Sequence, residues 1–427
     1  MSSIENIYQE DIDFAQLALQ DAEFAKVLKS NGQLDFSNPE SVLQLTKSLL
    51  KRDFGLQISL PSDRLCPPVP NRLNYILWIQ ALLDSTSDSY TDVYDPSREV
   101  LGLDIGTGAS CIYPLLGCSQ RPKWRFGGTD VDERSLEFAR KNVKGNDLAQ
   151  RIKLLKTSPN GPLISLDAFG FESADFSMCN PPFYESGADM LQSAESKQRP
   201  PNTACTGSAG EMVTPGGEVA FITRMIDESL VLKDRVQWYT SMCGKLSSVS
   251  TLLAILRSKK IDNYAVTEFV QGSKTRRWGI AWSFDDFRPP GTIARHLHSL
   301  PKQLLPFPPE YCISLPAGAN LEKASRVVNK TLSALPLKWM WRSTIAAGLG
   351  FTDRNVWSRA ARRQSRDQNT SDKMDDDELE MSLGFKIQIV EEKSANKLEP
   401  KVIIRWLKGN DAVLFESFCG MLKRKFK

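Results

Sequence analysis

The stretch that decides the fold is VLGLDIGTGAS, Val100–Ser110, in which an apolar run leads through an acid into a glycine-rich turn. The apolar run predicts a β-strand. Gly106 and Gly108 let the backbone turn tightly and let a ligand approach closely. The turn lacks the third glycine of dinucleotide-binding turns, and Asp104 precedes its glycines. An acid there suits a ligand with a positive charge and no phosphate, such as S-adenosylmethionine (SAM), so we predict that Asp104, Gly106 and Gly108 lie at a SAM site.

Short apolar segments alternate with helical patterns on the carboxyl side of this turn. The strand-like segments are Val100–Leu103, Arg125–Thr129, Ile152–Leu155 and Asp175–Cys179, and Glu133–Asn146 is helical. Such alternation is typical of βαβ units and a mainly parallel sheet. It predicts the α/β class, with a Rossmann-like SAM-dependent methyltransferase sheet over residues 99–287. Ala265–Gln271 and Arg277–Phe284 close this region as two paired strands.

A second acid ends the next predicted strand, in Phe126-Gly-Gly-Thr-Asp130. A carboxylate at this place can accept hydrogen bonds from both ribose hydroxyls of a nucleoside ligand. The alternative is that Gly106 and Gly108 only make a structural turn, and that Asp130 only caps the helix that begins near Glu133. Because the two acids end neighbouring strands, we favour a cofactor role for Asp130.

The motif Asn180-Pro181-Pro182-Phe183 follows the predicted strand at 175–179. The exocyclic amine of adenine is a poor nucleophile because its lone pair is delocalised into the ring. The Asn180 side-chain oxygen and the Pro181 carbonyl can accept hydrogen bonds from that amine and turn its lone pair toward a methyl group, while Pro181 and Pro182 stiffen the loop. Phe183 can stack on the base. The alternative is a proline-stiffened turn with a core aromatic, so the position at a strand's carboxyl end favours catalysis.

The flanking regions predict further domains. Residues 1–98 have helical patterns and predict an N-terminal helical extension, including a helix at Leu73–Leu83. Residues 288–318 are rich in proline and predict a linker with little regular structure. Residues 319–427 predict a second, smaller α+β unit, interrupted by an acidic loop at 371–380. Its expected elements are the helices Leu321–Leu335 and Asp411–Arg424 and the strands Phe385–Val390 and Val402–Leu407.

Composition excludes several classes of function. The 427 residues carry a net charge of only +3, so charge alone names no partner. Two histidines, His296 and His298, leave little room for His-dependent catalysis or a metal site, and none of the eight cysteines forms a Cys-x-x-Cys pair. No apolar run approaches the length of a membrane span or a signal peptide. We expect a soluble protein of a reducing compartment, with no metal.

The chain resembles the methyltransferase-like 16 family, the N6-adenosine methyltransferases of U6 small nuclear RNA, whose bacterial relatives modify ribosomal RNA. The similar segments are Asp53–Leu56, Val69–Tyr75, Asp104–Gly117, Cys179–Phe183, Gly216–Glu218 and Trp278–Phe284. The resemblance implies that S-adenosyl-L-methionine contacts Arg72, Gly106, Ser110, Asp130 and Asn180, and that a further contact comes from the loop at Leu163. A guanidinium at Arg72 can grip the methionyl carboxylate with two hydrogen bonds.

The C-terminal half resembles the same family less closely. Phe385–Ile389, Ile404–Lys408 and Leu414–Arg424 are similar to its vertebrate-conserved region, an α+β module that in the family dimerises and binds U6. The resemblance therefore implies a homodimer through this module, a structured RNA partner and a nuclear location, with a cytoplasmic pool left open. The family's basic N-terminal arm has no counterpart before Lys26, so we expect RNA contacts elsewhere.

Basic residues outside the core motifs are the candidates for RNA contact. Residues 323–366 hold ten Lys or Arg and one acid, with Trp339, Trp341 and Trp357 between them; we expect most of these tryptophans in the core. The candidate RNA-binding residues are Lys197, Arg199, Lys274, Arg276, Arg277, Arg359, Arg362, Arg363 and Arg366. Together these features predict an RNA (adenine-N6)-methyltransferase. The alternatives are a protein-glutamine N5-methyltransferase, which also uses Asn-Pro-Pro and an aromatic, and an RNA-binding factor for which methylation is secondary.

Overall fold

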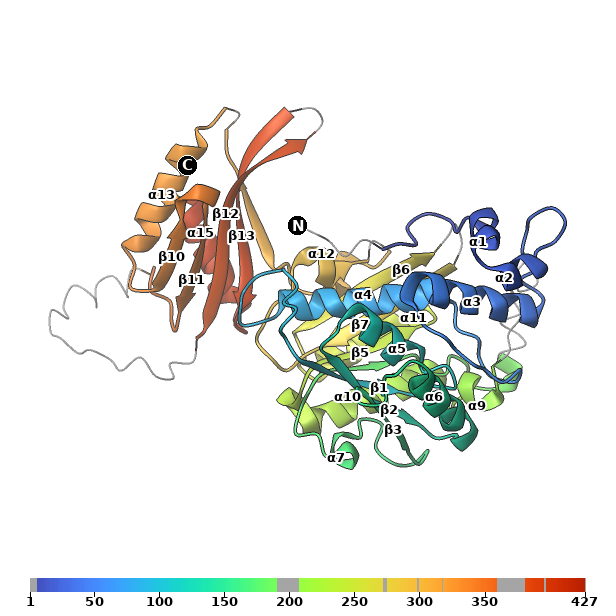
Figure 1. The fold of residues 1–427 in the computed structure, drawn as a ribbon. Helices are drawn as coiled ribbons and strands as arrows, with labels where there is room; N and C mark the ends of the chain where they lie inside the picture. Colours follow the sequence, from blue (N-terminus) through green and yellow to red (C-terminus); the bar gives the residue numbers. More distant parts are fainter. Residues whose placement is uncertain are drawn as a thin grey trace. The chain divides into compact units, whose positions relative to one another are not determined.

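The computed structural model describes residues 6–189, 207–271, 275–297, 299–316, 318–358, 381–394 and 397–426. They form two compact units (Figure 1). The first unit, here called the catalytic unit, contains Met1–Asp84, Val93–Asp285 and Arg295–Leu305. The second, the C-terminal unit, contains Ser85–Asp92, Asp286–Ala294 and Pro306–Lys427. No helix among the described residues is long and apolar enough to cross a bilayer.

The catalytic unit is built on an eight-stranded sheet of order β3-β2-β1-β4-β5-β7-β6-β8. Its first five strands run parallel, β7 runs antiparallel to both β5 and β6, and β8 pairs parallel with β6. The strands are β1 (Val100–Ile105), β2 (Trp124–Asp130), β3 (Ile152–Lys156), β4 (Ala174–Cys179), β5 (Val236–Cys243), β6 (Tyr264–Gln271), β7 (Thr275–Trp282) and β8 (Arg295–His296). The predicted α/β class and the predicted strands are confirmed.

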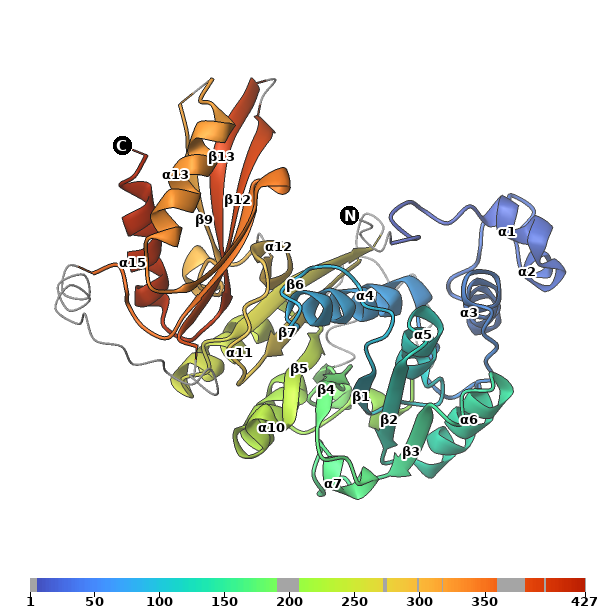
Figure 2. The same cartoon turned by 60° about the vertical axis from the view of Figure 1, so that its left-hand side comes forward.

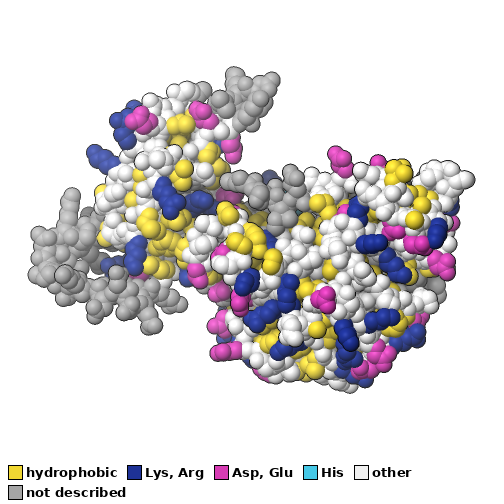
Figure 3. Space-filling view, in the orientation of Figure 1, with side chains coloured by type: hydrophobic (Ala, Val, Ile, Leu, Met, Phe, Trp, Pro, Cys, Tyr) yellow, Lys and Arg dark blue, Asp and Glu magenta, His cyan; other side chains and the backbone are white. Residues whose placement is uncertain are grey.

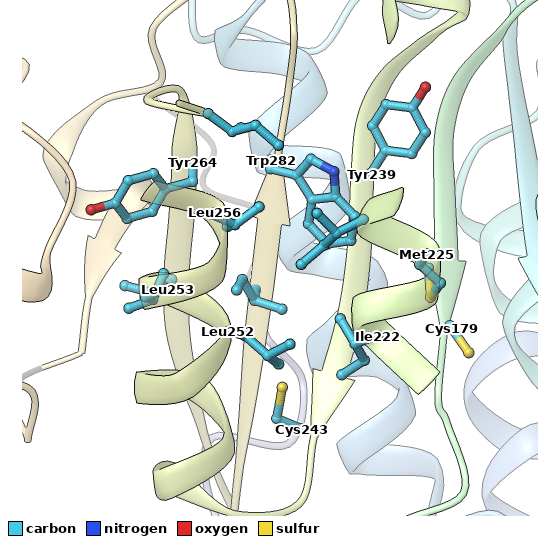
Figure 4. Packing of buried hydrophobic residues seen from close by; sticks show 14 of the residues in the cluster. Cys179, Ile222, Met225, Tyr239, Cys243, Leu252, Leu253, Leu256, Tyr264 and Trp282 are labelled. Carbon is cyan, nitrogen blue, oxygen red and sulfur yellow. The ribbon is translucent and has the colours of Figure 1, made fainter. Parts of the chain in front are cut away.

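Helices cover both faces of this sheet (Figure 2). They are α4 (Val69–Ser85), α5 (Ile112–Gln120), α6 (Glu133–Gly145), α7 (Leu166–Phe169), α9 (Ala209–Met212), α10 (Gly217–Leu232) and α11 (Leu246–Ser258). One core lies where α7, α10 and α11 meet the strands, with Ile222, Leu252 and Trp282 fully buried (Figure 4). On the other face, Gly102 leaves room for the rings of Phe176 and Phe126, and Gly117 leaves room for the ring of Phe126, since a Cβ on either glycine would overlap these rings.

Three N-terminal helices precede α4 and belong to the same unit: α1 (Phe14–Gln20), α2 (Ala22–Lys26) and α3 (Pro39–Phe54). Asn38 caps α3 by accepting the N–H of Glu40, and Pro39 occupies the first turn, where its missing N–H costs nothing. Gly55 ends α3 in the left-handed conformation at φ 66°. Helices are therefore present within residues 1–98 as predicted, although the segments 55–68 and 86–98 contain none, and contacts place 1–84 with the eight-stranded sheet.

The C-terminal unit is a five-stranded antiparallel sheet of order β10-β11-β12-β13-β9 with two long helices. The strands are β9 (Glu310–Ser314), β10 (Lys338–Arg342), β11 (Ala347–Thr352), β12 (Leu383–Ser394) and β13 (Lys397–Lys408), and the helices are α13 (Leu321–Ser333) and α15 (Ala412–Lys423). Its core joins residues of both helices, such as Val328 and Phe418, to strand residues such as Phe385 and Ile404. The predicted α+β class of this unit is confirmed.

Two connecting segments of the chain pack within the C-terminal unit. Arg405 on β13 donates to both carboxylate oxygens of Asp92 at 2.6 Å, and its side chain is only 9% exposed. Arg288 donates to the Gly409 carbonyl and lies over the ring of Trp406 at 4.6 Å. These contacts explain why residues 85–92 and 286–294 cluster with the C-terminal sheet.

The linker predicted over 288–318 differs from the structure. This stretch contains α12 (Gly291–Ala294), β8, a short 3₁₀ helix at Lys302–Leu304, and β9, which pairs with β13. Prolines are tolerated here because they fall between these elements or before them, where no ladder hydrogen bond is needed. The acidic loop predicted at 371–380 lies outside the described residues.

The three tryptophans between the basic residues of the C-terminal unit have structural partners. Trp357 is 4% exposed and donates to the Ser417 hydroxyl. Trp339 and Trp341 stack on one another at 5.7 Å and pack against the core, and Trp339 donates to Asn329. The prediction that most of these tryptophans belong to the core is confirmed.

Candidate active site

The glycine-rich turn after β1 is an open cradle. Gly106 and Gly108 have φ angles of 73° and 64°, which side chains rarely adopt. A Cβ on Gly106 would meet no atom within 4 Å, and one on Gly108 would meet only a Glu211 carboxylate oxygen, at 3.9 Å. Ser110, in the same turn, is 6% exposed. The turn therefore leaves room for a ligand against its backbone.

Asp130 ties the end of β2 to this turn. Its Oδ2 accepts the N–H of Gly108 at 2.9 Å and its Oδ1 accepts the N–H of Asp132 at 2.9 Å. The residue that caps α6 is Asp132, whose carboxylate accepts from Arg134 and Ser135. Capping is thus no explanation for Asp130. Burial raises the pKa of its carboxyl.

Asp104 is a buried acid without a cationic partner. Its side chain is fully buried, and no ion pair or well-aligned hydrogen bond reaches either carboxylate oxygen among the described residues. Burial raises the pKa of Asp104 to about 7; the nearby Thr107 hydroxyl and the charge of Arg72 oppose the rise, and the charge of Asp130 adds to it. Because a buried unpaired carboxylate is costly, this position fits a ligand that brings positive charge. The residues present therefore fit SAM, whose ammonium and sulfonium groups are both cationic.

Arg72 enters the site from the first turns of α4. It is 7% exposed and donates to the Tyr113 hydroxyl at 3.0 Å and to the Met242 sulfur at 3.6 Å. Tyr113 begins α5 and Met242 lies near the end of β5, so the guanidinium lies where three elements converge. Neither contact neutralises its charge, which leaves it able to bind an anionic group.

The Asn180–Phe183 loop follows β4 at the same edge of the sheet. The N–H of Cys179 donates to the Tyr75 hydroxyl at 3.4 Å, and that hydroxyl is paired with Thr240 Oγ1 at 2.6 Å. Thr240 in turn donates to the Ser177 carbonyl at 2.9 Å, so α4, β4 and β5 are joined directly before the loop. Within the loop, Asn180 Oδ1 is buried and has no hydrogen-bond partner among the described residues. It is a pre-positioned acceptor.

Phe183 is partly buried between two neighbours. The Arg277 guanidinium lies over its ring, 5.5 Å from the centroid. On another side the backbone of Gly244 lies close to the ring. Burial and the charge of Arg72 lower the pKa of Arg277, which places both cations in one electrostatic neighbourhood. Phe183 as a whole is half-buried, and its role as a stacking platform stays a prediction.

The remaining predicted residues divide into three groups. Leu163 lies between β3 and α7; its N–H donates to the Glu228 carboxylate at 2.9 Å and its side chain packs on the core, so its cofactor role stays a prediction. Arg276 is exposed and pairs with Glu268 at 3.1 Å. Seven predicted RNA-binding residues lie outside the described residues: Lys197, Arg199, Lys274, Arg359, Arg362, Arg363 and Arg366.

Charge on the visible surface is mixed. Figure 3 shows Lys and Arg side chains interspersed with Asp and Glu on the drawn face of each unit, in keeping with the net charge of +3. The drawn face therefore carries no field of one sign.

Sequence analysis missed supporting residues that the structure brings to the site. Tyr75, Tyr113 and Thr240 form the hydrogen bonds behind Arg72 and the Asn180 loop, and Glu218 is a buried carboxylate beside that loop. Tyr75 and Glu218 lie in segments that resemble a known family, and this resemblance is the sequence signal that could have indicated them. No local pattern pointed to Thr240, because its role depends on strand pairing.

Comparison with known proteins identifies close relatives. A family model described as RNA methyltransferase matches residues 3–286. A U6 small nuclear RNA (adenine-(43)-N(6))-methyltransferase of Schizosaccharomyces pombe is 36% identical over 93% of this chain and 96% of its own length. The human RNA N(6)-adenosine-methyltransferase METTL16 is 43% identical; the match covers 64% of this chain and 49% of the human protein, so the chain spans about half that relative's length.

Solved structures agree with the sequence matches. The human METTL16 catalytic domain in complex with MAT2A 3'UTR hairpin 1 is 40% identical with a TM-score of 0.59, over 66% of this chain and 94% of that chain. The N-terminal domain of human METTL16 in complex with SAH is 39% identical with a TM-score of 0.54, over 66% of this chain and 98% of that chain.

Proposed function

The chain belongs to the METTL16 family of SAM-dependent RNA (adenine-N6)-methyltransferases, and on this premise we propose that its substrate is an adenosine of U6 small nuclear RNA. One observation supports the chemistry above all: Asn180 Oδ1 is a buried acceptor without a partner, on a loop stiffened by two prolines. An adenine amine is the donor that such an acceptor lacks. Family membership assigns RNA rather than a protein glutamine as the substrate.

SAM supplies an electrophilic methyl group on a sulfonium. In the proposed site Arg72 grips the methionyl carboxylate, because its guanidinium is buried and has no acidic partner in the described part of the chain. Asp104 supplies the negative charge near the cationic groups. Asp130 accepts the ribose hydroxyls, while Gly106, Gly108 and Ser110 present their backbone to the ligand. The loop at Leu163 contributes a further contact with the cofactor.

The adenine is held by the loop. Asn180 Oδ1 and the Pro181 carbonyl accept the two N6 hydrogens and so direct the nitrogen lone pair toward the methyl carbon. Pro181 and Pro182 restrict the backbone, which reduces the entropy lost on alignment. Phe183 stacks on the base, and Arg277 above the ring adds a cation that can meet the RNA backbone.

RNA binding is assigned to basic residues of both units. Arg276 and Arg277 lie near the loop, and the C-terminal unit contributes its Arg-rich segment, with Arg362 and Arg363 at its centre. Replacing both with alanine should weaken RNA binding and reduce the slope of its salt dependence by about two, since each phosphate contact releases about one counterion. An unchanged slope would argue against contact there. A U6 substrate further supports a nuclear location, and the resemblance of the C-terminal unit to the family's vertebrate-conserved region supports a homodimer.

The decisive experiment is methylation of short RNAs, including U6, with labelled SAM and nucleoside mass spectrometry as the readout. We expect N6-methyladenosine in U6. Asn180→Ala should lower kcat by about 10²–10³-fold, the loss typical of removing one preorganised polar group, while RNA affinity changes less than twofold. If methylation survives the substitution, the catalytic assignment is wrong. If cellular phenotypes survive while methylation is lost, the protein acts mainly as an RNA-binding factor.

A further inference from the structure

A second buried carboxylate lies beside the Asn180–Phe183 loop and has no part in the chemistry described so far. Glu218 is 3% exposed and follows Gly216 and Gly217, whose φ angles of 73° and 63° start α10 abruptly. Burial raises the pKa of Glu218. Its two oxygens accept the N–H groups of Gly244, at 2.5 Å, and Lys245, at 3.1 Å. Glu218 therefore holds the turn between β5 and α11.

That turn is in contact with Phe183. A Cβ on Gly244 would lie 2.9 Å from Phe183 Cδ1 and 3.2 Å from Glu218 Oε2. Glycine is thus required for the backbone to approach both the ring and the carboxylate. A Cβ on Gly217 would lie 3.6 Å from the carbonyl oxygen of Phe183. The segment Gly216–Glu218 consequently contacts the loop twice, once at its backbone and once, through Gly244, at its ring.

The base of the loop is fixed by a backbone bridge. The N–H of Tyr184 donates to the Met212 carbonyl at 3.0 Å, and the N–H of Thr214 donates to the Tyr184 carbonyl at 2.9 Å. Since Arg277 lies over the ring, Phe183 has supports on several sides. Among the supports in the described part of the chain, Glu218 is a buried carboxylate that accepts the N–H of Gly244, the residue whose backbone lies against the ring.

We propose that Glu218 is a positioning residue: it fixes the Gly244 turn against Phe183 and thereby sets the plane on which the target adenine stacks. The inference rests on the proposed function, in which Phe183 stacks on that base. Because small displacements of a reacting group reduce rates strongly, a loosened ring lowers the rate of methyl transfer more than it weakens cofactor binding. The competing explanation is that Glu218 only stabilises the N-terminus of α11, where a carboxylate is favourable.

A double-mutant cycle separates the two explanations. Glu218→Gln keeps the shape but replaces one accepting oxygen with an NH₂ group that faces a backbone donor. We expect kcat for U6 methylation to fall about tenfold, within the range of one base–aromatic stack, with the Kd for SAM changed less than twofold. In a Phe183→Ala background the same substitution should cause no further loss, because the ring through which it acts is gone. When RNA with 2-aminopurine at the target position is bound to the Glu218→Gln variant, it should lose the fluorescence quenching that stacking on Phe183 causes in wild type.

The control is Asp175→Asn. Asp175 also accepts a backbone N–H, that of Leu101 at 2.8 Å, but lies at the opposite end of β4 from the loop. The Asp175→Asn substitution should lower thermal stability without changing kcat or the fluorescence of 2-aminopurine in the bound RNA. If Glu218→Gln unfolds the protein, Glu218→Asp makes the same test, because its carboxylate keeps its charge but reaches one methylene less far toward the N–H groups of Gly244 and Lys245; its effect should show the same dependence on Phe183.

The outcomes of these experiments separate a failure of the positioning role from a failure of the proposed function. Equal fold losses in the two backgrounds, or a loss confined to stability, would overturn the positioning role. A wild-type protein that binds SAM but forms no N6-methyladenosine would instead refute the proposed function, and the 2-aminopurine signal would then be absent in wild type as well.

Discussion

Replacing Asp104 with asparagine should stabilise the ligand-free protein in a pH-dependent way. The Asp104 carboxyl is fully buried and its pKa is raised to about 7 from an ordinary value of 3.8. Well below pH 3.8 it is protonated in both the folded and the unfolded chain and does not reduce the free energy of unfolding. As the pH rises from about 4 to 7, Asp104 ionises in the unfolded chain but stays protonated in the folded chain. The free energy of unfolding therefore decreases. At about 1.4 kcal/mol for each pKa unit, the loss reaches roughly 4 kcal/mol above pH 7.

Thermal unfolding between pH 4 and pH 8 measures this loss. At roughly 2 °C for each kcal/mol in a unit of this size, the melting temperature of Asp104→Asn should exceed that of wild type by about 8 °C more at pH 8 than at pH 4. The cost of burying the asparagine amide does not depend on pH. It therefore cancels when the difference in melting temperature at pH 8 is compared with that at pH 4. Asp147→Asn is the control, because Asp147 is exposed and its left-handed backbone, φ 57°, suits asparagine. A difference that does not vary with pH would refute the argument.

Three further results are expected, and they concern the cofactor and the C-terminal unit. Wild type should bind SAM about tenfold more tightly at pH 8 than at pH 6 in calorimetry, because only ionised Asp104 attracts the cationic ligand; a flat profile would contradict this. Arg72→Lys should raise the Kd for SAM at least about tenfold, because an ammonium cannot form the two parallel hydrogen bonds; an unchanged Kd would exclude Arg72 as the carboxylate ligand. Gly350→Ala should destabilise the C-terminal unit by about 1–3 kcal/mol in denaturant titrations, since its Cβ would overlap the ring of Phe385, while SAM affinity stays the same.

Much of the fold could be predicted because local patterns and tertiary structure agree in it. The strand at 100–105 is apolar up to its acid, and the helix at 133–145 has an amphipathic pattern with its cap one residue before it. Residues 288–318 were harder, since β9 is a five-residue strand among prolines whose pairing with β13 spans about ninety positions of sequence. No local signal reports a partner so far away.

The residues of the site also fall into those that local sequence predicts and those that it does not. Glycines, prolines and acids at strand ends are visible in sequence, because the backbone conformation that they allow is local. The hydroxyl of Thr240 and the carboxylate of Glu218 act on β4 and on the Gly244 turn, and their relevance appears only when β4, β5 and α10 are packed together. Pattern analysis therefore finds residues that touch a ligand more readily than residues that hold those in place.

Unsatisfied polar atoms are informative about where ligands bind. Nearly all buried polar groups in folded proteins have hydrogen-bond partners, so each exception reduces stability. Nine residues in the described part of the chain have such atoms, and three of them belong to the proposed site: Asn71 next to Arg72, Asp104 on β1 before the glycine-rich turn, and Asn180 in the loop after β4. Others, among them Gln80 and Arg121, belong to no part of the proposed site, so an unsatisfied atom points to a ligand only where it lies beside other site residues. A protein that satisfied these groups internally would fold more stably but would have no acceptor left for an amine and no charge left for a cation. Their cost in the free protein is thus the same free energy that SAM and RNA recover on binding, which is why ligand-induced stabilisation should fall in Asp104→Asn although the variant itself is more stable.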